Sequence, residues 1–263
     1  MTTILQLSDT HIVPRDELCS GQLDTTESLT RLVERITSIR DQIGQIDALL
    51  VTGDLTDDGS AASYARFKSL VAPLDLPTYV LTGNHDAREA MRAAFADTLP
   101  KTGLLNWTRR VGGVQLIGLD TLIEGQGAGR LGEDGLAFLK DALSQAAGAP
   151  VLLGLHHPPF ASGIEFMDKI GLIDGDALRD ILASYHGPLR ILCGHIHRMI
   201  VADVAGHIAI SAPSPASTFS YDRRQEAPVG FMRQEGGALL HRWDTGFQTI
   251  TIEANAGSGP FPF

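Results

Sequence analysis

Residues able to bind a metal ion stand at the ends of five apolar runs in this chain. The clearest run, residues 49–51, leads through Thr52 and Gly53 to the carboxylate of Asp54. A strand followed by Gly-Asp is often only a turn, so this ending alone is weak evidence. The other four runs lead to Asp9 and His11, to Asn84 and His85, to His156, and to His195 and His197. Because sites in open α/β sheets form outside the carboxyl ends of strands, we expect these side chains to meet in one crevice.

The candidate ligands are imidazole, carboxylate and amide groups, and no thiolate is among them. This set suits borderline divalent ions such as zinc, manganese, iron or cobalt, and it argues against a structural zinc site built from cysteines. A single histidine at a strand end is more often structural than a ligand. Five such ends on one edge make a metal site the stronger interpretation.

The same residues resemble the five signature blocks of the calcineurin-like metallophosphoesterases. The blocks span residues 4–197, in order and with no ligand substituted, and are Asp9-x-His11, Gly53-Asp54, Gly83-Asn84-His85-Asp86, His156 and Gly194-His195-x-His197. Two further details are the stretch His156-His157-Pro158-Pro159 and the Met167-Asp168 segment behind it. They resemble the bacterial branch that holds the class III cyclic nucleotide phosphodiesterases and the binuclear glycerophosphodiesterases.

The resemblance implies two divalent metal ions of the manganese, iron, zinc or cobalt class. Asp54 would bridge them, because one carboxylate can ligate two ions about 3.5–4 Å apart. The other ligands of the first ion would be Asp9, His11 and His197, and those of the second ion Asn84, His156 and His195.

The implied reaction is hydrolysis of a phosphoester by attack of a metal-bound hydroxide. The sequence contains no Gly-x-Ser-x-Gly elbow that would supply a serine nucleophile instead. Asn84 and His85 are the candidate catalytic residues, together with Asp86, which is expected to orient His85. His85 would stabilise charge or protonate the leaving alkoxide. The alternative for His85 is that it only braces its loop.

The leading functional prediction is a metal-dependent phosphodiesterase that hydrolyses small phosphodiesters. Cyclic 3′,5′-nucleotides and glycerophosphodiesters are the expected substrates. The alternative enzymes on the same site are a phosphomonoesterase and a nucleotide-sugar pyrophosphatase, and a nuclease is disfavoured by charge. A scaffold that has lost catalysis would show degraded ligands, whereas every ligand position here is filled.

Composition limits the partners and the location. The chain has 263 residues, a hydrophobic fraction of 43% and a net charge of −10. The negative charge disfavours long nucleic acids, whose binding relies on lysine and arginine, and leaves a small substrate. No apolar run approaches the about 20 residues of a membrane span. The sequence opens directly in a predicted strand without an export segment, and its two cysteines lie far apart, so a cytoplasmic location is expected.

The elements that must position the site can be predicted from apolar periodicity. Asp24 and Glu27 predict a helix start, and apolar residues at helical spacing continue to Ile43. This helix joins strands 4–7 and 48–52, which should therefore be parallel neighbours. Further helices are expected at 60–71, 88–95, 133–147 and 176–185, and further strands at 78–81, 107–111, 114–119, 151–155, 189–193, 199–204, 208–211, 238–243 and 247–252.

The fold class expected from periodicity is α/β with mixed sheets, and the resemblance implies a four-layer α/β/β/α sandwich in which helices flank two sheets. One domain is expected, with residues 1–200 as the catalytic core. Residues 201–263 are expected to complete the second sheet, with a loosely held tail at 256–263. The apolar hairpin 238–252 is a candidate cap or dimerisation element, so a homodimer or higher homo-oligomer is predicted.

Overall fold

The chain begins with the predicted βαβ unit. The computed structural model describes residues 1–259, 261 and 262. In it β1 (Thr2–Leu7) is buried throughout and pairs in parallel with β2 (Ala48–Val51). Between them α1 (Thr25–Ser38) begins at Asp24, whose side chain accepts a hydrogen bond from the backbone NH of Glu27. The predicted helix to residue 43 is in fact two helices, because the chain leaves helical geometry at Ile39 before α2 (Arg40–Ile43).

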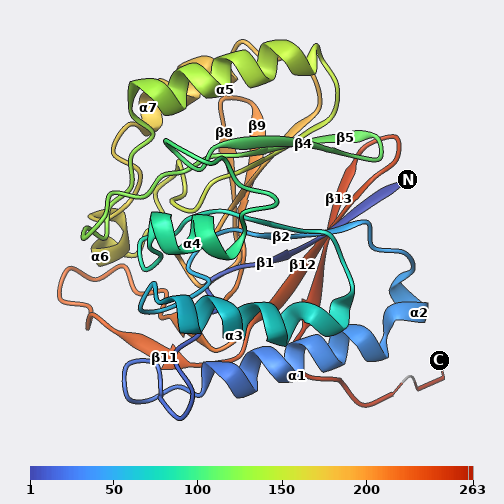
Figure 1. The fold of residues 1–263 in the computed structure, drawn as a ribbon, viewed down its shortest axis with the longest axis vertical. Helices are drawn as coiled ribbons and strands as arrows, with labels where there is room; N and C mark the ends of the chain where they lie inside the picture. Colours follow the sequence, from blue (N-terminus) through green and yellow to red (C-terminus); the bar gives the residue numbers. More distant parts are fainter. Residues whose placement is uncertain (260, 263) are drawn as a thin grey trace.

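The first sheet has the strand order β13-β12-β1-β2-β3, in which β3 is Thr78–Val80, β12 is Gly237–Trp243 and β13 is Phe247–Glu253. Ser60 caps α3 (Ala61–Val71), since its hydroxyl accepts from the NH of Ser63. Helices α1 and α3 lie along the outer face of this sheet, at the bottom of Figure 1. The elements that complete this half are α3 (Ala61–Val71), the short 3₁₀ helix η1 (Ala72–Leu74), β3 (Thr78–Val80) and α4 (Arg88–Ala94).

The second sheet has the strand order β4-β5-β6-β7-β9-β8. It opens with the predicted β4–β5 hairpin and continues with parallel strands β5, β6, β7 and β9. Helices α5 and α7 cover its outer face, at the top of Figure 1. Its elements are β4 (Trp107–Val111), β5 (Val114–Gly118), α5 (Gly132–Ala146), β6 (Val151–Gly154), α6 (Glu165–Asp168), α7 (Gly175–Leu182), β7 (Leu189–Cys193), β8 (Ile200–Val204) and β9 (His207–Ser211).

Apolar side chains join the two sheets into one molecule. Leu50 of β2, Leu152 of β6 and Leu192 of β7 belong to the same buried cluster, although they come from different sheets. The order of layers is therefore helix, sheet, sheet, helix, and the predicted fold class is confirmed. Within residues 1–259 and 261–262, no helix combines the length and the apolar character needed to cross a bilayer.

The strands after residue 200 divide between the two sheets instead of all completing the second one. β8 and β9 extend the second sheet, whereas β12 (Gly237–Trp243) pairs antiparallel with β1 and carries β13 (Phe247–Glu253) as the edge of the first sheet. The first five residues of β12 are buried, as expected for an interior strand whose two faces are covered. A ribbon of β10 (Ser217–Phe219) and β11 (Phe231–Arg233) was not expected. Residues 260 and 263 of the expected tail lie outside the described residues.

A buried glutamine aligns the strands beneath the candidate site. The amide of Gln6 donates to the hydroxyl of Thr52 at 2.9 Å and to the carbonyl of Cys193 at 3.0 Å. Its oxygen lies 2.9 Å from Nε2 of His241 in β12. Because strands of both sheets share this one side chain, their carboxyl ends are held in register next to the candidate ligands.

Candidate metal centre

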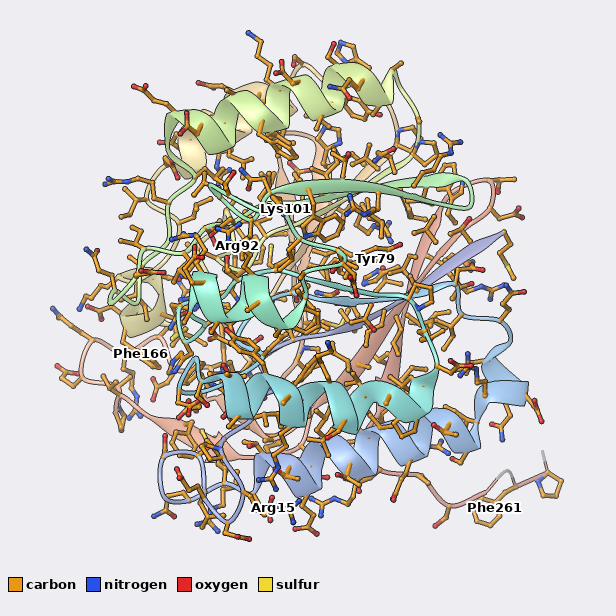
Figure 2. All side chains as sticks on the ribbon, viewed as in Figure 1. Arg15, Tyr79, Arg92, Lys101, Phe166 and Phe261 are labelled. Carbon is orange, nitrogen blue, oxygen red and sulfur yellow. The ribbon has the colours of Figure 1, made fainter. Side chains whose placement is uncertain are left out.

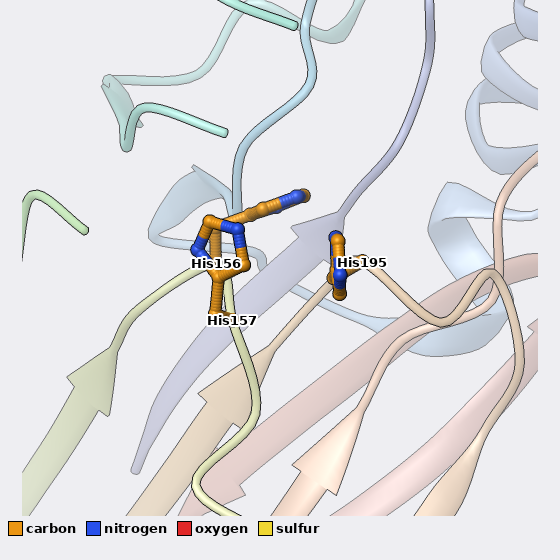
Figure 3. Close-up of side chains that lie close together, drawn as sticks. All are labelled: His156, His157 and His195. Carbon is orange, nitrogen blue, oxygen red and sulfur yellow. The ribbon is translucent and has the colours of Figure 1, made fainter. Parts of the chain in front are cut away.

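All seven predicted ligand residues converge at the carboxyl ends of strands from both sheets. Six of them are buried, and Asn84 is half-buried. Figure 3 shows His156 and His195 projecting from the ends of neighbouring strands, with His157 beside them. The first sheet supplies Asp9 and His11 after β1, Asp54 after β2 and Asn84 after β3, and the second sheet supplies His156 after β6 and His195 and His197 after β7.

The backbone is strained where these side chains leave the strands. Non-glycine residues rarely adopt positive φ, and strain of this kind concentrates at functional sites. Here such residues follow three of the strands, β1, β2 and β7. Five of the seven candidate ligands have φ between +43° and +70°, namely Asp9, His11, Asp54, His195 and His197.

Glycines before the ligands allow the loops to touch. A Cβ on Gly83 would lie 2.1 Å from Oδ1 of Asp54, and a Cβ on Gly194 would lie 2.7 Å from Oδ2 of Asp9. Neither position can therefore carry a side chain without separating the loops. The Gly-Asn and Gly-His pairs of the sequence are thus explained by close approach of the backbones.

One group of donor atoms forms around His11 and His197. Their Nε2 atoms are 3.1 Å apart. Nε2 of His197 lies 3.5 Å from Oδ1 of Asp9, and Nε2 of His11 lies 3.6 Å from Oδ2 of Asp54. Tetrahedral zinc, with Zn–N bonds of about 2.1 Å, holds its ligand atoms about 3.4 Å apart. The observed separations fit donors that share one such ion.

A second group of donor atoms forms around Asn84. Its Oδ1 lies 3.1 Å from Nε2 of His156 and 2.9 Å from Nδ1 of His195. Nε2 of His156 also lies 3.3 Å from Oδ2 of Asp54. The same carboxylate oxygen of Asp54 therefore borders both groups, which is the position of a bridging ligand.

The protonation states of Asp54, His195 and His197 suit metal binding, whereas His156 would lose a proton on binding an ion. Burial acts to lower the pKa of His156, but Asp54 and Asp9 raise it to about 9. Burial lowers the pKa of His195 and of His197 far below the usual value, so both rings are neutral near pH 7. Burial acts to raise the pKa of Asp54, but His156 and His11 outweigh it and hold that pKa well below its usual range. Neutral imidazole and ionised carboxylate are the forms that ligate metals. The donor set of this structure can therefore hold metal ions.

Each histidine ligand candidate is held through its second ring nitrogen. Partners of this kind fix the tautomer and the orientation of a ligating ring. The four pairs are His11 Nδ1 with Asp57 Oδ1 at 3.0 Å, His156 Nδ1 with the carbonyl of Thr52 at 2.8 Å, His195 Nε2 with the carbonyl of Ile170 at 3.1 Å, and His197 Nδ1 with Ser217 Oγ at 2.9 Å.

Asp57, which sequence reasoning missed, connects a ligand candidate to His85. Its Oδ1 lies 3.0 Å from Nδ1 of His11 and 3.2 Å from Nδ1 of His85. The two imidazole rings meet edge to face with centroids 4.7 Å apart. Burial acts to lower the pKa of His85, but the hydrogen bond that its ring donates to Asp57 and the charges of Asp54 and Asp57 raise that pKa to about 9. The signal in the sequence is a second carboxylate three residues after Asp54.

The predicted role of Asp86 in orienting His85 is wrong in this structure. The carboxylate of Asp86 points away from His85 and accepts from the NH of Gly83 at 2.9 Å and the hydroxyl of Tyr64 at 2.9 Å. It also accepts from the NH groups of Leu55 and Thr56 at 3.3 Å. The physical reason is burial, because the side chain faces the loop after β2. Asp86 therefore joins the two loops that carry Asp54 and Asn84, and Asp57 is the residue that contacts His85.

Asp120 is a second supporting residue outside the signature blocks. Asp120 directly follows the apolar run 114–119, just as the ligand candidates follow apolar runs, and its side chain is buried. Its carboxylate accepts from the hydroxyl of Thr82 at 2.8 Å and from Nε of Arg88 at 2.8 Å. These partners lie on either side of Asn84 and His85, so Asp120 anchors that loop to the second sheet.

His157 lies beside the ligand candidates but is fully engaged elsewhere. Its Nδ1 is 2.8 Å from the hydroxyl of Thr121 and its Nε2 is 3.0 Å from the carbonyl of Gly127. Burial lowers its pKa to about 3, with a further contribution from His156. The ring therefore packs against His156 and His195 as a neutral neighbour, as Figure 3 shows.

A cavity of about 200 Å³ opens in front of the donor atoms. Every ligand candidate except His156 lines it, together with Asp57 and His85. The side chain of His85 is 42% exposed and so remains accessible to a bound molecule. The cavity places a small ligand against the donors and His85 at once.

The chain belongs to the calcineurin-like phosphoesterase family. The family model matches residues 2–199, which contain all seven ligand candidates. The family assignment made from the signature blocks is thereby confirmed.

Two curated relatives are phosphodiesterases by name. A probable glycerophosphodiester phosphodiesterase GpdQ of Arcobacter nitrofigilis is 33% identical over 265 residues, covering 99% of this chain and 96% of the relative. The 3′,5′-cyclic adenosine monophosphate phosphodiesterase CpdA of Pseudomonas aeruginosa is 40% identical over 195 residues, covering 74% of this chain and 69% of the relative.

Solved structures share the fold at low sequence identity. A dimetal phosphatase from Danio rerio aligns with a TM-score of 0.65 at 15% identity, covering 95% of this chain and 98% of that one. A purple acid phosphatase from yellow lupin aligns with a TM-score of 0.66 at 13% identity, covering 91% of this chain and 49% of that one. These similarities support the architecture alone.

Proposed function

We propose that this protein is a phosphodiesterase that holds two metal ions and hydrolyses small phosphodiesters. The observation that carries the proposal is the shared oxygen of Asp54, whose Oδ2 lies 3.6 Å from Nε2 of His11 and 3.3 Å from Nε2 of His156. Two donor groups that meet at one carboxylate oxygen fit a pair of ions. The phosphodiesterase names of the relatives support the reaction, and the cavity supports a small substrate.

The proposed ligands divide as the two donor groups do. Divalent ions bound there supply positive charge that polarises a phosphoryl oxygen and activates water. The ionised carboxylates of Asp9 and Asp54 offset only half of the charge of two divalent ions, so the centre attracts an anionic ester. Nitrogen and oxygen donors without a thiolate favour manganese, iron, zinc or cobalt.

His85 is the proposed catalytic side chain of the protein itself. Asp57 holds its Nδ1, and within the described residues no hydrogen bond is made by its Nε2. Nε2 is therefore free to donate a proton to, or stabilise charge on, the leaving oxygen of a bound ester. Asn84 directly precedes His85 in the chain, and the amide oxygen of Asn84 belongs to the second donor group. One short loop would therefore contribute both a metal ligand and the catalytic side chain.

The lining of the cavity favours a diester over the alternative substrates. None of the described residues that line it is lysine or arginine. A phosphomonoester dianion or a nucleotide-sugar diphosphate would therefore find only the His85 imidazolium as a side-chain cation beyond the metal centre. A diester, which is a monoanion, needs less compensating charge.

We expect bis(p-nitrophenyl) phosphate to be hydrolysed with a kcat/KM at least about tenfold above that of p-nitrophenyl phosphate. The extra charge of the monoester should strengthen its binding to both ions and slow its turnover, so inorganic phosphate should inhibit. Some hydrolysis of 3′,5′-cyclic AMP is expected. Both nitrophenyl esters are compared at one pH and one metal loading, and a preference for the monoester would move the assignment to a phosphatase.

We also infer a homodimer formed through the part of the chain after His197. Exposed apolar side chains support this inference, because Tyr221, Val229 and Met232 are 55%, 75% and 49% exposed near the β10–β11 ribbon. Ile250 on the edge strand β13 is also 40% exposed. Light scattering at micromolar concentration should give twice the monomer mass, and a monomer mass would contradict the inference.

The cytoplasmic location and the exclusion of long nucleic acids stay predictions from composition. The net charge of −10 supports the second of them.

A further inference from the structure

Three phenylalanines from two separate segments form one side of the cavity. We call Phe166, Phe219 and Phe231 the aromatic wall. Phe219 of β10 and Phe231 of β11 are directly paired across the ribbon, so both side chains project from the same face. Phe166 of α6, labelled in Figure 2, meets Phe219 edge to face with ring centroids 5.3 Å apart.

The aromatic wall begins next to the metal centre. The ring of Phe219 lies 4.7 Å from the ring of His197, centroid to centroid, at an angle of 37°. Two residues earlier, Ser217 Oγ lies 2.9 Å from Nδ1 of the same histidine. The ribbon is therefore fixed to a ligand candidate, and a substituent of an ester bound at the centre would lie against the wall.

Most hydroxyl groups that line the cavity are already engaged, and only that of the exposed Ser20 makes no side-chain hydrogen bond within the described residues. Met167 and Ile170 continue the apolar surface beyond Phe166. The hydroxyl of Thr25 donates to the carbonyl of His11 at 2.9 Å, and that of Ser214 donates to the carbonyl of Asp9 at 2.7 Å. These two hydroxyls are therefore committed to holding the ligand loops.

We propose that the aromatic wall is the subsite for a planar ring in the substrate, and that it selects nucleoside phosphodiesters over glycerol phosphodiesters. Phe231, which is 36% exposed, offers a ring face on which a nucleobase can stack. A glycerol group would lose water there without gaining hydrogen bonds. The inference rests on the proposed function, since that function defines the phosphodiester bond that is hydrolysed. Binding of a planar ring can nevertheless be measured without any hydrolysis.

The proposed metal ligands and two of the three residues of the aromatic wall lie in different parts of the chain. The proposed metal ligands all lie within the family-matched residues 2–199, whereas Phe219 and Phe231 lie beyond them. Substrate preference can therefore change through the β10–β11 ribbon while the metal centre stays constant.

The test compares two ligands that differ only in the base. Adenosine 5′-monophosphate and ribose 5-phosphate carry the same sugar and phosphate, so their affinity ratio isolates the contribution of the ring. We expect the protein loaded with two equivalents of Mn²⁺ to bind the adenosine compound about tenfold more tightly by titration calorimetry. This readout does not depend on turnover.

Three variants locate the effect. Phe231→Ala should bring the two dissociation constants within about twofold, and Phe231→Trp should keep the ratio. Met232→Ala is the matched control: Met232 is the next residue on the same strand, does not line the cavity, and should leave the ratio unchanged. Phe219 is left intact because it packs on His197.

The outcomes separate the wall from the proposed reaction. Equal binding of the two ligands by the unaltered protein, or an unchanged ratio in Phe231→Ala, would overturn the aromatic subsite. A tenfold ratio that is lost in Phe231→Ala, in a protein that hydrolyses no diester, would support the subsite and overturn the proposed phosphodiesterase function.

Discussion

Asp54→Asn should remove the second metal equivalent and nearly all activity. Oδ1 of Asp54 accepts from the NH of His85 at 2.8 Å, while Oδ2 borders both donor groups. An asparagine that keeps the bond to His85 places its NH₂ group, which cannot ligate, at the shared position. Loss of a residue that only supports a ligand typically lowers metal affinity by about 10–100-fold. Because Asp54 is itself the proposed ligand, we expect the metal affinity to fall by more than about 100-fold.

Metal content after gel filtration and the rate on bis(p-nitrophenyl) phosphate check this expectation together. Asp58→Asn is the control, because Asp58 is an exposed carboxylate four residues further along the same loop. A far-ultraviolet spectrum and a melting curve show whether Asp54→Asn folds. If that variant kept two tightly bound ions and a near-normal rate, Asp54 would not bridge.

His85→Ala should keep both metal ions and slow turnover by about 10²–10⁴-fold. His85 is outside both donor groups, and it lines the same cavity as every ligand candidate except His156. If the ring donates a proton, the loss should be larger for alkyl than for nitrophenyl leaving groups, because a poor leaving group needs the proton most.

The contrast between leaving groups decides what His85 does. An equal loss for both kinds of ester would show that the ring positions the substrate and does not protonate it. His186→Ala serves as control, since His186 is exposed and does not line the cavity. Asp57→Asn should weaken both the rate and the first metal site, because Asp57 contacts His85 and His11 together.

The ligand candidates could be predicted because their positions follow from the strands. Asp54 and His195 each come directly after an apolar run and a glycine, and parallel strands bring such ends to one edge. Asp57 and Asp86 could not be assigned in the same way. Their directions depend on tight turns, and Asp54 itself has a φ of +48°, which the sequence pattern does not reveal. The partner of His85 was therefore misassigned by sequence reasoning.

The pairing of distant strands was equally beyond periodicity. Apolar residues indicated that β12 is a strand, but the pattern of apolar residues does not reveal which strand it pairs with. In the structure Trp243 of β12 pairs with Thr2 of β1. The β10–β11 ribbon has only three residues in each strand, which is too short to show a period. The aromatic wall that it carries could be found only from the structure.

The division of the ligand set between two sheets has a consequence for the way this protein matures. Before the sheets dock, the loops of the first sheet can offer the donors of Asp9, His11, Asp54 and Asn84, and the second sheet only three imidazoles. Neither half presents all the donors of either proposed metal site. We therefore expect tight metal binding only after the long-range pairing that brings residue 9 beside residue 195. Metal loading of a nascent chain would then report that its two halves have come together.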